Sequence, residues 1–214
     1  MEIGVITGDI VSSHKLEDRS IWLNKLKAIF NDLDANFLQL SDQWDIFRGD
    51  SFQLRVQQPE QTLKIALLIR AGLKSLEVFT KNKMNVRIAI GIGSEEFKGD
   101  NIREADGTAY QNSGKLLDSI IEKQILLALK SPWKDFDEEM QVSFALAEVL
   151  INGWSYKSAE IAWWMLRGET TQKELSNILK ISQPAVHKRI QRVYYDELKM
   201  LEWRFRNKII KLNK

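Results

Sequence analysis

The fold of the first half of the chain is decided by residues 44–56, which read WDIFRGDSFQLRV. Phe52, Leu54 and Val56 alternate with polar side chains, which is the period of a strand buried on one face. The pattern predicts two short strands joined by a tight turn over residues 48–51, where Gly49 can supply a positive backbone angle. Asp50 is then expected to project from the tip of a rigid hairpin.

A second aspartate is expected in a similar setting near the start of the chain. Residues 2–10 read EIGVITGDI, an apolar strand that ends in Gly8 and Asp9. Two aspartates at the ends of neighbouring strands can hold a divalent cation through oxygen ligands. The alternative is that each aspartate only hydrogen-bonds the backbone of its own turn.

The elements around the hairpin follow a recognisable order. Apolar spacing predicts a first strand at 2–8, a helix at 21–37, the hairpin at about 43–57, a helix opened by Pro59, and a strand at 86–93. A helix at 107–121 and a short strand at 124–129 follow. Strand-helix-strand-strand-helix-strand is the ferredoxin-like plan, an antiparallel sheet backed by helices. In that plan Asp9 and Asp50 are expected on the same rim of the sheet.

One face of the strand at 86–93 carries Arg87 followed by three small residues. Ala89, Gly91 and Gly93 leave room for a close neighbour, either a packed helix or a ligand. Glycines in strands commonly mark a close approach of backbone without a ligand. We therefore expect a packed helix there.

The second half of the chain differs in both pattern and charge. Pro132 and Trp133 break the earlier pattern, and the rest is expected to be helical. Lys and Arg total 31 against 29 for Asp and Glu, but residues 157–214 carry a balance of +7 and residues 1–156 a balance of −5. We predict an α+β protein with a ferredoxin-like domain at 1–132, a connecting helix at 133–156 and an all-helical domain at 157–214. The basic second half is a candidate for nucleic-acid binding.

Two short helices with a turn between them are predicted inside the basic half. Thr171 and Glu174 fit a capping box, and Ser182 with Pro184 can start a second helix after a short turn. A helix pair of this kind, with exposed amide and basic side chains, describes a helix-turn-helix. Glutamine can pair with adenine, and Lys or Arg can reach guanine or phosphate. The expected DNA-binding residues on the second helix are Gln183, His187, Lys188, Arg189 and Arg192.

Further cations beyond that helix are expected to neutralise phosphates, namely Arg204, Arg206, Lys208 and Lys211. The segments TQKEL at 171–175 and ISQPAV at 181–186 resemble the helix-turn-helix of bacterial transcription regulators and of the last region of sigma factors. Lys180 stands near the place where those proteins often have glycine. The alternative interpretation is a solvated basic helix pair that serves only in packing or dimerisation.

Four segments of the first half resemble the landmarks of class III nucleotide cyclases, in the same order. They are TGDIVSS at 7–13, RGDSF at 48–52, VRIAIGIG at 86–93 and GTAYQN at 107–112. The chain also resembles the bacterial SatD family over its whole length. The resemblance to cyclases implies that Asp9 and Asp50 carry Mg²⁺ or Mn²⁺, with the Ile10 carbonyl as a further oxygen ligand, and that a nucleotide binds beside them.

The sequence departs from the cyclase pattern at several positions. Ile46 replaces the Lys that reads the base, and Asp106 is only near the place of the base-selecting Asp. Gln111 and Lys115 stand where cyclases have Asn and Arg, unless a shift of one residue brings in Asn112. Lys115 can supply the charge of Arg but not its planar two-point grip. The candidate nucleotide-binding residues are therefore Ile10, Gln111, Asn112 and Lys115.

Composition excludes several classes of function. There is no cysteine, so disulfides, thiolate chemistry and cysteine-bound zinc are excluded. The start of the chain is a strand pattern and no apolar run is long enough to span a bilayer, so we expect a cytoplasmic protein without a membrane partner. The first hypothesis is a homodimeric, DNA-binding transcription regulator with a nucleotide- or metal-sensing domain. The alternatives are a metal-dependent nucleotidyl cyclase or transferase, and a structural scaffold.

Overall fold

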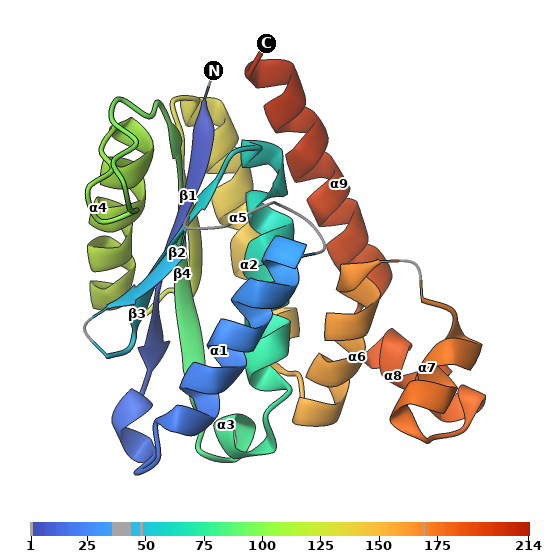
Figure 1. The fold of residues 1–214 in the computed structure, drawn as a ribbon. Helices are drawn as coiled ribbons and strands as arrows, with labels where there is room; N and C mark the ends of the chain where they lie inside the picture. The colour runs from blue at the N-terminus through green and yellow to red at the C-terminus, as the bar shows by residue number, and fades with distance from the viewer. Residues whose placement is uncertain (1, 36–43, 48, 169) are drawn as a thin grey trace.

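The computed structural model describes residues 2–35, 44–47, 49–168 and 170–214. Within them the chain forms a mixed α/β structure on a five-stranded sheet of order β2-β3-β1-β4-β5 (Figure 1). The strands are β1 (Ile3–Val11), β2 (Trp44–Phe47), β3 (Ser51–Val56), β4 (Asn85–Gly93) and β5 (Leu127–Lys130). All neighbours are antiparallel except β4 and β5, which are parallel.

Some sequence predictions fall outside the described residues. These are the end of the first helix at Phe37, the start of the hairpin at 43, and Arg48 in its turn. The described part of that helix, α1, spans Ser20–Leu33. The last strand begins at Leu127, three residues later than predicted, because Gln124 adopts a left-handed backbone angle (φ +57°) as it leaves the preceding helix.

Helices cover both faces of the sheet. One face packs against α1 and α2 (Thr62–Lys74), and it is formed by Ile6, Ile10 and the alternating isoleucines of β4. A 3₁₀ turn at Pro59–Gln61 precedes α2. A short helix, α3 (Glu77–Lys81), follows α2. The opposite face packs against α4 (Thr108–Glu122), seen at the left of Figure 1.

The small residues of β4 lie directly beneath α4. A Cβ atom added to Gly91 would lie 2.2 Å from the Ala109 carbonyl oxygen, and one added to Gly93 would lie 2.3 Å from Thr108 Oγ1. Neither distance is possible in a folded protein without a shift of the backbone. The close neighbour expected on this face is therefore a packed helix.

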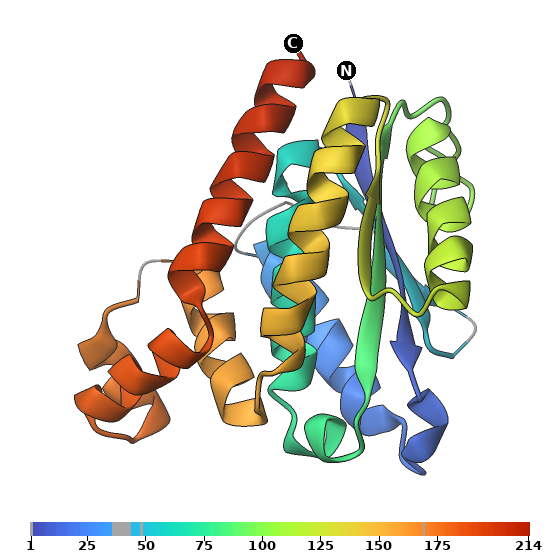
Figure 2. The same cartoon turned by 180° about the vertical axis from the view of Figure 1, so that it is seen from behind.

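The second half of the chain packs on the α1–α2 side of the sheet (Figures 1 and 2). Its helices are α5 (Lys134–Asn152), α6 (Tyr156–Arg167), α7 (Gln172–Leu179), α8 (Gln183–Arg192) and α9 (Tyr195–Leu212). Phe205 of α9 is fully buried and its ring centroid lies 5.5 Å from that of Phe136 and 6.1 Å from that of Phe144, both on α5. A single hydrophobic cluster therefore joins the sheet, α2, α5 and the helices that follow.

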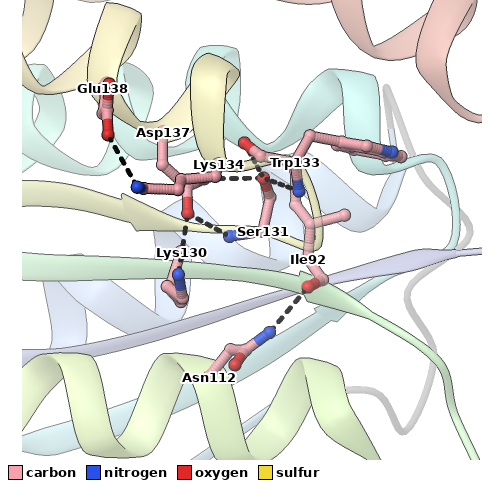
Figure 3. A network of polar contacts seen from close by, with 8 residues as sticks. All are labelled: Ile92, Asn112, Lys130, Ser131, Trp133, Lys134, Asp137 and Glu138. Carbon is pink, nitrogen blue, oxygen red and sulfur yellow. Dashed lines mark hydrogen bonds and ion pairs between the residues drawn. The ribbon is translucent and has the colours of Figure 1, made fainter.

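Polar contacts join β5 to the start of α5 (Figure 3). Ser131 Oγ donates to Asp137 Oδ1 at 2.6 Å, and the Ser131 N–H donates to Asp137 Oδ2 at 3.2 Å. The Lys130 ammonium lies 3.1 Å from the same carboxylate. These contacts satisfy backbone groups at the end of an edge strand and fix the direction in which α5 leaves the sheet.

The two chain ends lie close together in both views (Figures 1 and 2). Asn213 Oδ1 accepts a hydrogen bond from the Glu2 N–H at 3.0 Å, which ties the end of α9 to the start of β1. Among the described residues, no helix combines the length and the apolar character needed to cross a bilayer.

Candidate functional site

The structure brings Asp9 and Asp50 to one rim of the sheet. Asp9 pairs with Ser51 in the β1–β3 register, and Asp50 is the residue before Ser51 in the hairpin. The Ile10 N–H donates to the Asp50 carbonyl oxygen at 3.0 Å, and Ser13 Oγ donates to Asp50 Oδ2 at 2.7 Å. Gly49 has φ +81°, the turn geometry expected from the sequence. We call Asp9, Asp50, Ser13 and Arg87 the acidic rim.

Sequence reasoning missed two members of the acidic rim, Ser13 and the cationic Arg87. Arg87 lies opposite Asp9 in the β1–β4 register, and its Nη1 atom is 3.0 Å from Asp9 Oδ2. Both side chains are largely buried, at 17% and 16% exposure. The alternating pattern of β4 shows that Arg87 faces away from the core, but not which residue of another strand it meets.

The second carboxylate oxygen of Asp9 is in an unusual state. Oδ1 is buried and has no hydrogen-bond partner in the part of the chain that the structure describes. Burial raises the pKa of Asp9 above its ordinary value of 3.8; Arg87 opposes this shift and the nearby Asp50 carboxylate adds to it. Asp9 Oδ1 is the atom of the rim best placed to accept a cation or a proton.

The donor set for a metal ion at the rim is small. Among the described residues, no group of three or more His, Asp or Glu side chains gathers where it could hold a metal ion. The rim offers two carboxylates, one engaged by Arg87 and the other by Ser13. Any cation there would have to complete its coordination with backbone oxygen, water or a ligand's own phosphates.

Two of the predicted nucleotide-binding residues of α4, Gln111 and Asn112, lie away from the rim. Asn112 Nδ2 donates to the Ile92 carbonyl oxygen at 2.9 Å (Figure 3), and Ile92 pairs with Gly4, five residues from Asp9 along β1. That separation is roughly 17 Å along the strand. Gln111 Nε2 lies 3.5 Å from Asp106 Oδ1 in the loop before α4. Within one chain, neither Gln111 nor Asn112 is placed beside Asp9.

The remaining two nucleotide-binding candidates differ from each other. Lys115 is exposed on α4, one turn beyond Gln111. The Ile10 side chain is buried in the core at 2% exposure, so that only its backbone can serve the rim.

The second candidate surface is formed by α7 and α8. Thr171 Oγ1 accepts from the Glu174 N–H at 3.2 Å, and Glu174 Oε2 accepts from the Thr171 N–H at 2.8 Å, which confirms the predicted capping box. Lys180 ends α7 in a left-handed conformation (φ 51°) at the position where glycine is common. Buried Leu175 and Val186 belong to the main hydrophobic cluster and anchor the two helices to the body.

The outer face of α8 carries most of the predicted DNA-binding residues. Gln183, His187, Lys188 and Arg192 are exposed, whereas Val186 is fully buried. His187 Nδ1 lies 3.5 Å from Gln172 Nε2 on α7. We call these four exposed residues the α8 outer face. No ion pair between described residues involves Lys188 or Arg192.

Arg189 does not share this exposed position, and the expectation that it lies on the outer surface is wrong. Its side chain is only 19% exposed and its Nη1 atom is 4.0 Å from Glu160 Oε2 on α6. One step along a helix turns the side chain by about 100°, which is enough to direct Arg189 toward the body while Lys188 faces outward. Arg189 therefore holds α8 against α6.

The cations of α9 are also used inside the chain. Arg204 Nε lies 2.8 Å and Lys208 Nζ 3.4 Å from the Glu139 carboxylate on α5, while Arg206 pairs with Glu202 one turn away at 2.6 Å. Lys211 is exposed. The prediction that Arg204, Arg206 and Lys208 mainly neutralise phosphates overlooked these acidic partners.

The chain is similar to one protein family and, weakly, to a solved structure. The family model described as the SatD family matches residues 3–209. No curated protein matches the chain. Among solved structures, a bacterial light-regulated adenylyl cyclase is similar at 15% sequence identity and a TM-score of 0.37, over 60% of this chain and 74% of that chain.

Proposed function

The chain belongs to the SatD family, and we propose that it is a DNA-binding transcription regulator whose α7 and α8 form a helix-turn-helix. The observation that carries the proposal is the α8 outer face. Lys188 and Arg192 project from α8 without an acidic partner among the described residues, whereas Arg204, Arg206 and Lys208 of α9 are paired within the chain. Unpaired cations beside an exposed Gln183 suit a phosphate backbone and the edges of bases.

The dimensions of the pair support the same use. α8 has ten residues, about 15 Å of helix, and follows α7 after a turn at residues 180–182. An α-helix with its side chains is about 10–12 Å across and therefore fits the major groove, which is about 12 Å wide. The helix-turn-helix geometry places the start of the second helix against the bases and its cations near the phosphates.

Each residue of the α8 outer face has a proposed role. Gln183, at the first position of α8, pairs with an adenine edge. Lys188 and His187 contact guanine or phosphate, and Arg192, at the last position, neutralises a phosphate. Arg189 is a positioning residue that acts through Glu160.

The first half of the chain is proposed to be a ferredoxin-like, cyclase-palm-like domain. The order β1-α1-β2-β3-α2-β4, apart from the short α3, and the arrangement β2-β3-β1-β4 within the sheet support it. Its task in a regulator is to sense a nucleotide or metal, or to hold two copies together as a homodimer, as helix-turn-helix proteins commonly require.

A test of DNA binding uses the double variant Lys188→Glu with Arg192→Glu on a duplex pool of random sequence. We expect affinity at about 0.1 M salt to fall by about 100-fold, since two phosphate contacts become repulsive. The matched control is Lys27→Glu with Lys98→Glu, which makes the same change in net charge at exposed positions on α1 and on the loop after β4. Equal affinity of both double variants would remove the main support for a DNA-binding role.

A second candidate function is a metal-dependent nucleotidyl cyclase or transferase. Asp9 Oδ1, which is buried and lacks a hydrogen bond, favours it. The separation between the acidic rim and Asn112 means that a second copy would have to supply Asn112. Turnover of nucleoside triphosphates with Mg²⁺ or Mn²⁺, lost in Asp9→Asn and in Asp50→Asn, would establish it; absence of turnover with all common triphosphates would dismiss it.

A further inference from the structure

The outer side of α5 carries a stripe of exposed aliphatic side chains. Val142, Leu146 and Val149 are 64%, 66% and 71% exposed, and Ala145 beside them is also exposed. Spacings of three and four residues place these side chains on one side of the helix. In Figure 2 α5 faces the viewer, on the side of the molecule away from α1. Large aliphatic side chains that gather on one exposed face are typical of an interaction surface. We call Val142, Ala145, Leu146 and Val149 the α5 stripe.

An exposed carboxylate stands at the end of α5 that precedes the stripe. Glu138 lies one turn ahead of Val142 on the same side of the helix. Its carboxylate is 3.7 Å from the Lys134 ammonium, but both side chains are mostly exposed, so this ion pair is weak. Glu138 is therefore available to a cation of another molecule.

A hollow of about 500 Å³ lies at the other end of the stripe. Val149 and Gly153 of the α5 end line it, together with Arg192 and Tyr194 from the junction of α8 and α9. Arg192 and Tyr194 are exposed, and among the described residues neither side chain has a hydrogen bond or an ion pair. A guanidinium and a phenol hydroxyl are donors that suit a carboxylate. The stripe therefore has an acid at one end and a cationic hollow at the other.

We propose that two copies of this chain associate through the α5 stripe, with their α5 helices antiparallel across a two-fold axis. When that axis passes between Ala145 and Leu146, Val142 of each copy lies opposite Val149 of the other. Ala145 and Leu146 of the two copies meet at the axis. The stripe then covers itself, as a two-fold interface requires of one patch on both subunits, and its aliphatic side chains leave water.

The same register brings the two charged ends together. Glu138 lies as far before the axis as Gly153 lies beyond it. The Glu138 carboxylate of each copy therefore falls at the hollow beside Gly153 of the other, where Arg192 and Tyr194 can donate to it. Symmetry makes this contact twice. A parallel pair would set Glu138 against Glu138 and leave both hollows empty. The match of acid to cation at both ends identifies a second copy as the occupant of the stripe.

The homodimer that belongs to the proposed function would use this surface, and in that respect the inference rests on the proposed function. Association through the α5 stripe does not itself require DNA. Arg192 also has a proposed phosphate contact, so self-association has to be measured in the absence of DNA.

Sedimentation equilibrium of the full chain without DNA measures the association. Between about 1 μM and about 1 mM, a range that covers weak and small interfaces, the chain is expected to pass from monomer to dimer. Leu146→Glu should weaken the dimer by about 100-fold or more, because it buries two uncompensated carboxylates near the axis. The matched control is Ile21→Glu at a 40% exposed residue of α1, which should leave the dimer dissociation constant within about twofold. Unchanged circular dichroism of both variants excludes loss of the fold.

A charge exchange tests the register. Glu138→Lys places a cation at the cationic hollow of the other copy and should weaken the dimer by about tenfold. Adding Arg192→Glu to the same chain restores opposite charges and should bring the dissociation constant back to within about threefold of the original. Lys188→Glu, which changes a charge of α8 outside the hollow, is the control and should leave the dimer unchanged.

Disulfide cross-linking tests the antiparallel direction, and the chain is suited to it because it has no cysteine of its own. Val142→Cys mixed with Val149→Cys should give a disulfide-linked pair under mild oxidation. Neither variant should cross-link alone, because its two symmetry-related thiols would lie about 10 Å apart along the helix, too far for a disulfide.

Four results would overturn the proposal. They are a monomer at all concentrations up to about 1 mM, a dimer that Leu146→Glu leaves intact, failure of Arg192→Glu to restore the Glu138→Lys variant, or cross-linking of either cysteine variant alone in preference to the mixture. A monomer would assign the stripe to a different protein partner. Because no DNA is present and Leu146→Glu leaves the α8 outer face unchanged, failure of the DNA-binding proposal would not alter these results.

Discussion

The acidic rim and the α8 outer face are both charged surfaces at the ends of well-packed elements. They differ in whether their charged side chains have partners within the chain. At the rim, the Asp9 carboxylate is paired with the Arg87 cation at 3.0 Å, and the Asp50 carboxylate accepts a hydrogen bond from Ser13 at 2.7 Å. On α8, Lys188 and Arg192 have no acidic partner among the described residues. A charge that is paired within the chain contributes to the fold, whereas exposed cations without an internal partner are solvated by water and remain available to a polyanion.

The largest expected effect concerns the core that both surfaces share. Phe205→Ala removes a fully buried ring that contacts Phe136 and Phe144, and should lower the free energy of unfolding by about 3–5 kcal/mol. Because one hydrophobic cluster joins the two halves, urea unfolding is expected to remain a single transition. The control Phe97→Ala, at a ring that is 60% exposed, should change stability by less than about 0.5 kcal/mol. Two separate transitions would show that the two surfaces belong to independent units.

The next effect concerns the internal compensation of the rim. Arg87→Gln removes the cation that holds Asp9 and should strengthen Mn²⁺ binding about tenfold, because Asp9 no longer has a competing positive charge. Arg103→Gln, which breaks the more exposed pair with Asp45, is the control. Electron paramagnetic resonance of free Mn²⁺ gives both affinities. If Arg87→Gln leaves Mn²⁺ binding unchanged, the rim is a structural ion pair and not a cation site.

A smaller effect is expected at the start of α7. Thr171→Ala removes the side-chain half of the capping box, in which Oγ1 accepts from the Glu174 N–H, and should cost about 1 kcal/mol of stability. Thr170→Ala, one residue earlier and outside the cap, is the matched control. Comparison of their urea midpoints measures how much of the stability of the α7–α8 pair is local; equal midpoints would mean that packing alone fixes this pair.

The smallest effect is a pH dependence at the rim. Because the folded pKa of Asp9 is raised above 3.8, the folded state binds more protons than the unfolded state just above that pH. Stability should therefore fall as pH rises from about 3.8 through the folded pKa, and Asp9→Asn should flatten this part of the curve. A variant whose stability curve parallels that of the original chain over this range would contradict the assignment.

The sequence was informative where a property depends on local spacing. Alternation in β3 and β4, the capping box at Thr171 and the buried Val186 all follow from residues a few positions apart. The position of Asp9 beside Asp50 required only the expected strand order and the hairpin register. These predictions use the short-range spacing rules of helices and strands, together with one assumption, the ferredoxin-like order of the strands.

Partners distant in the sequence could not be predicted. Arg87 meets Asp9 across 78 positions, and Arg204 meets Glu139 across 65. Both pairings depend on how elements pack, and a charge pattern does not encode that. The same limit explains the error at Arg189. Its spacing along α8 predicts a surface position, but its side chain lies toward Glu160 on α6 and is largely buried. Charged residues on a helix are therefore assigned to DNA safely only after their neighbours in the fold are known.

The most direct measurement of the central claim is the salt dependence of duplex DNA binding. The logarithm of the binding constant should fall linearly with the logarithm of salt concentration, and the slope should be smaller in magnitude by about 2 in the Lys188→Glu, Arg192→Glu variant, one counterion release for each lost phosphate contact. The Lys27→Glu, Lys98→Glu variant should keep the original slope. An identical slope in all three proteins, or no measurable binding by the original chain at low salt, would contradict the account.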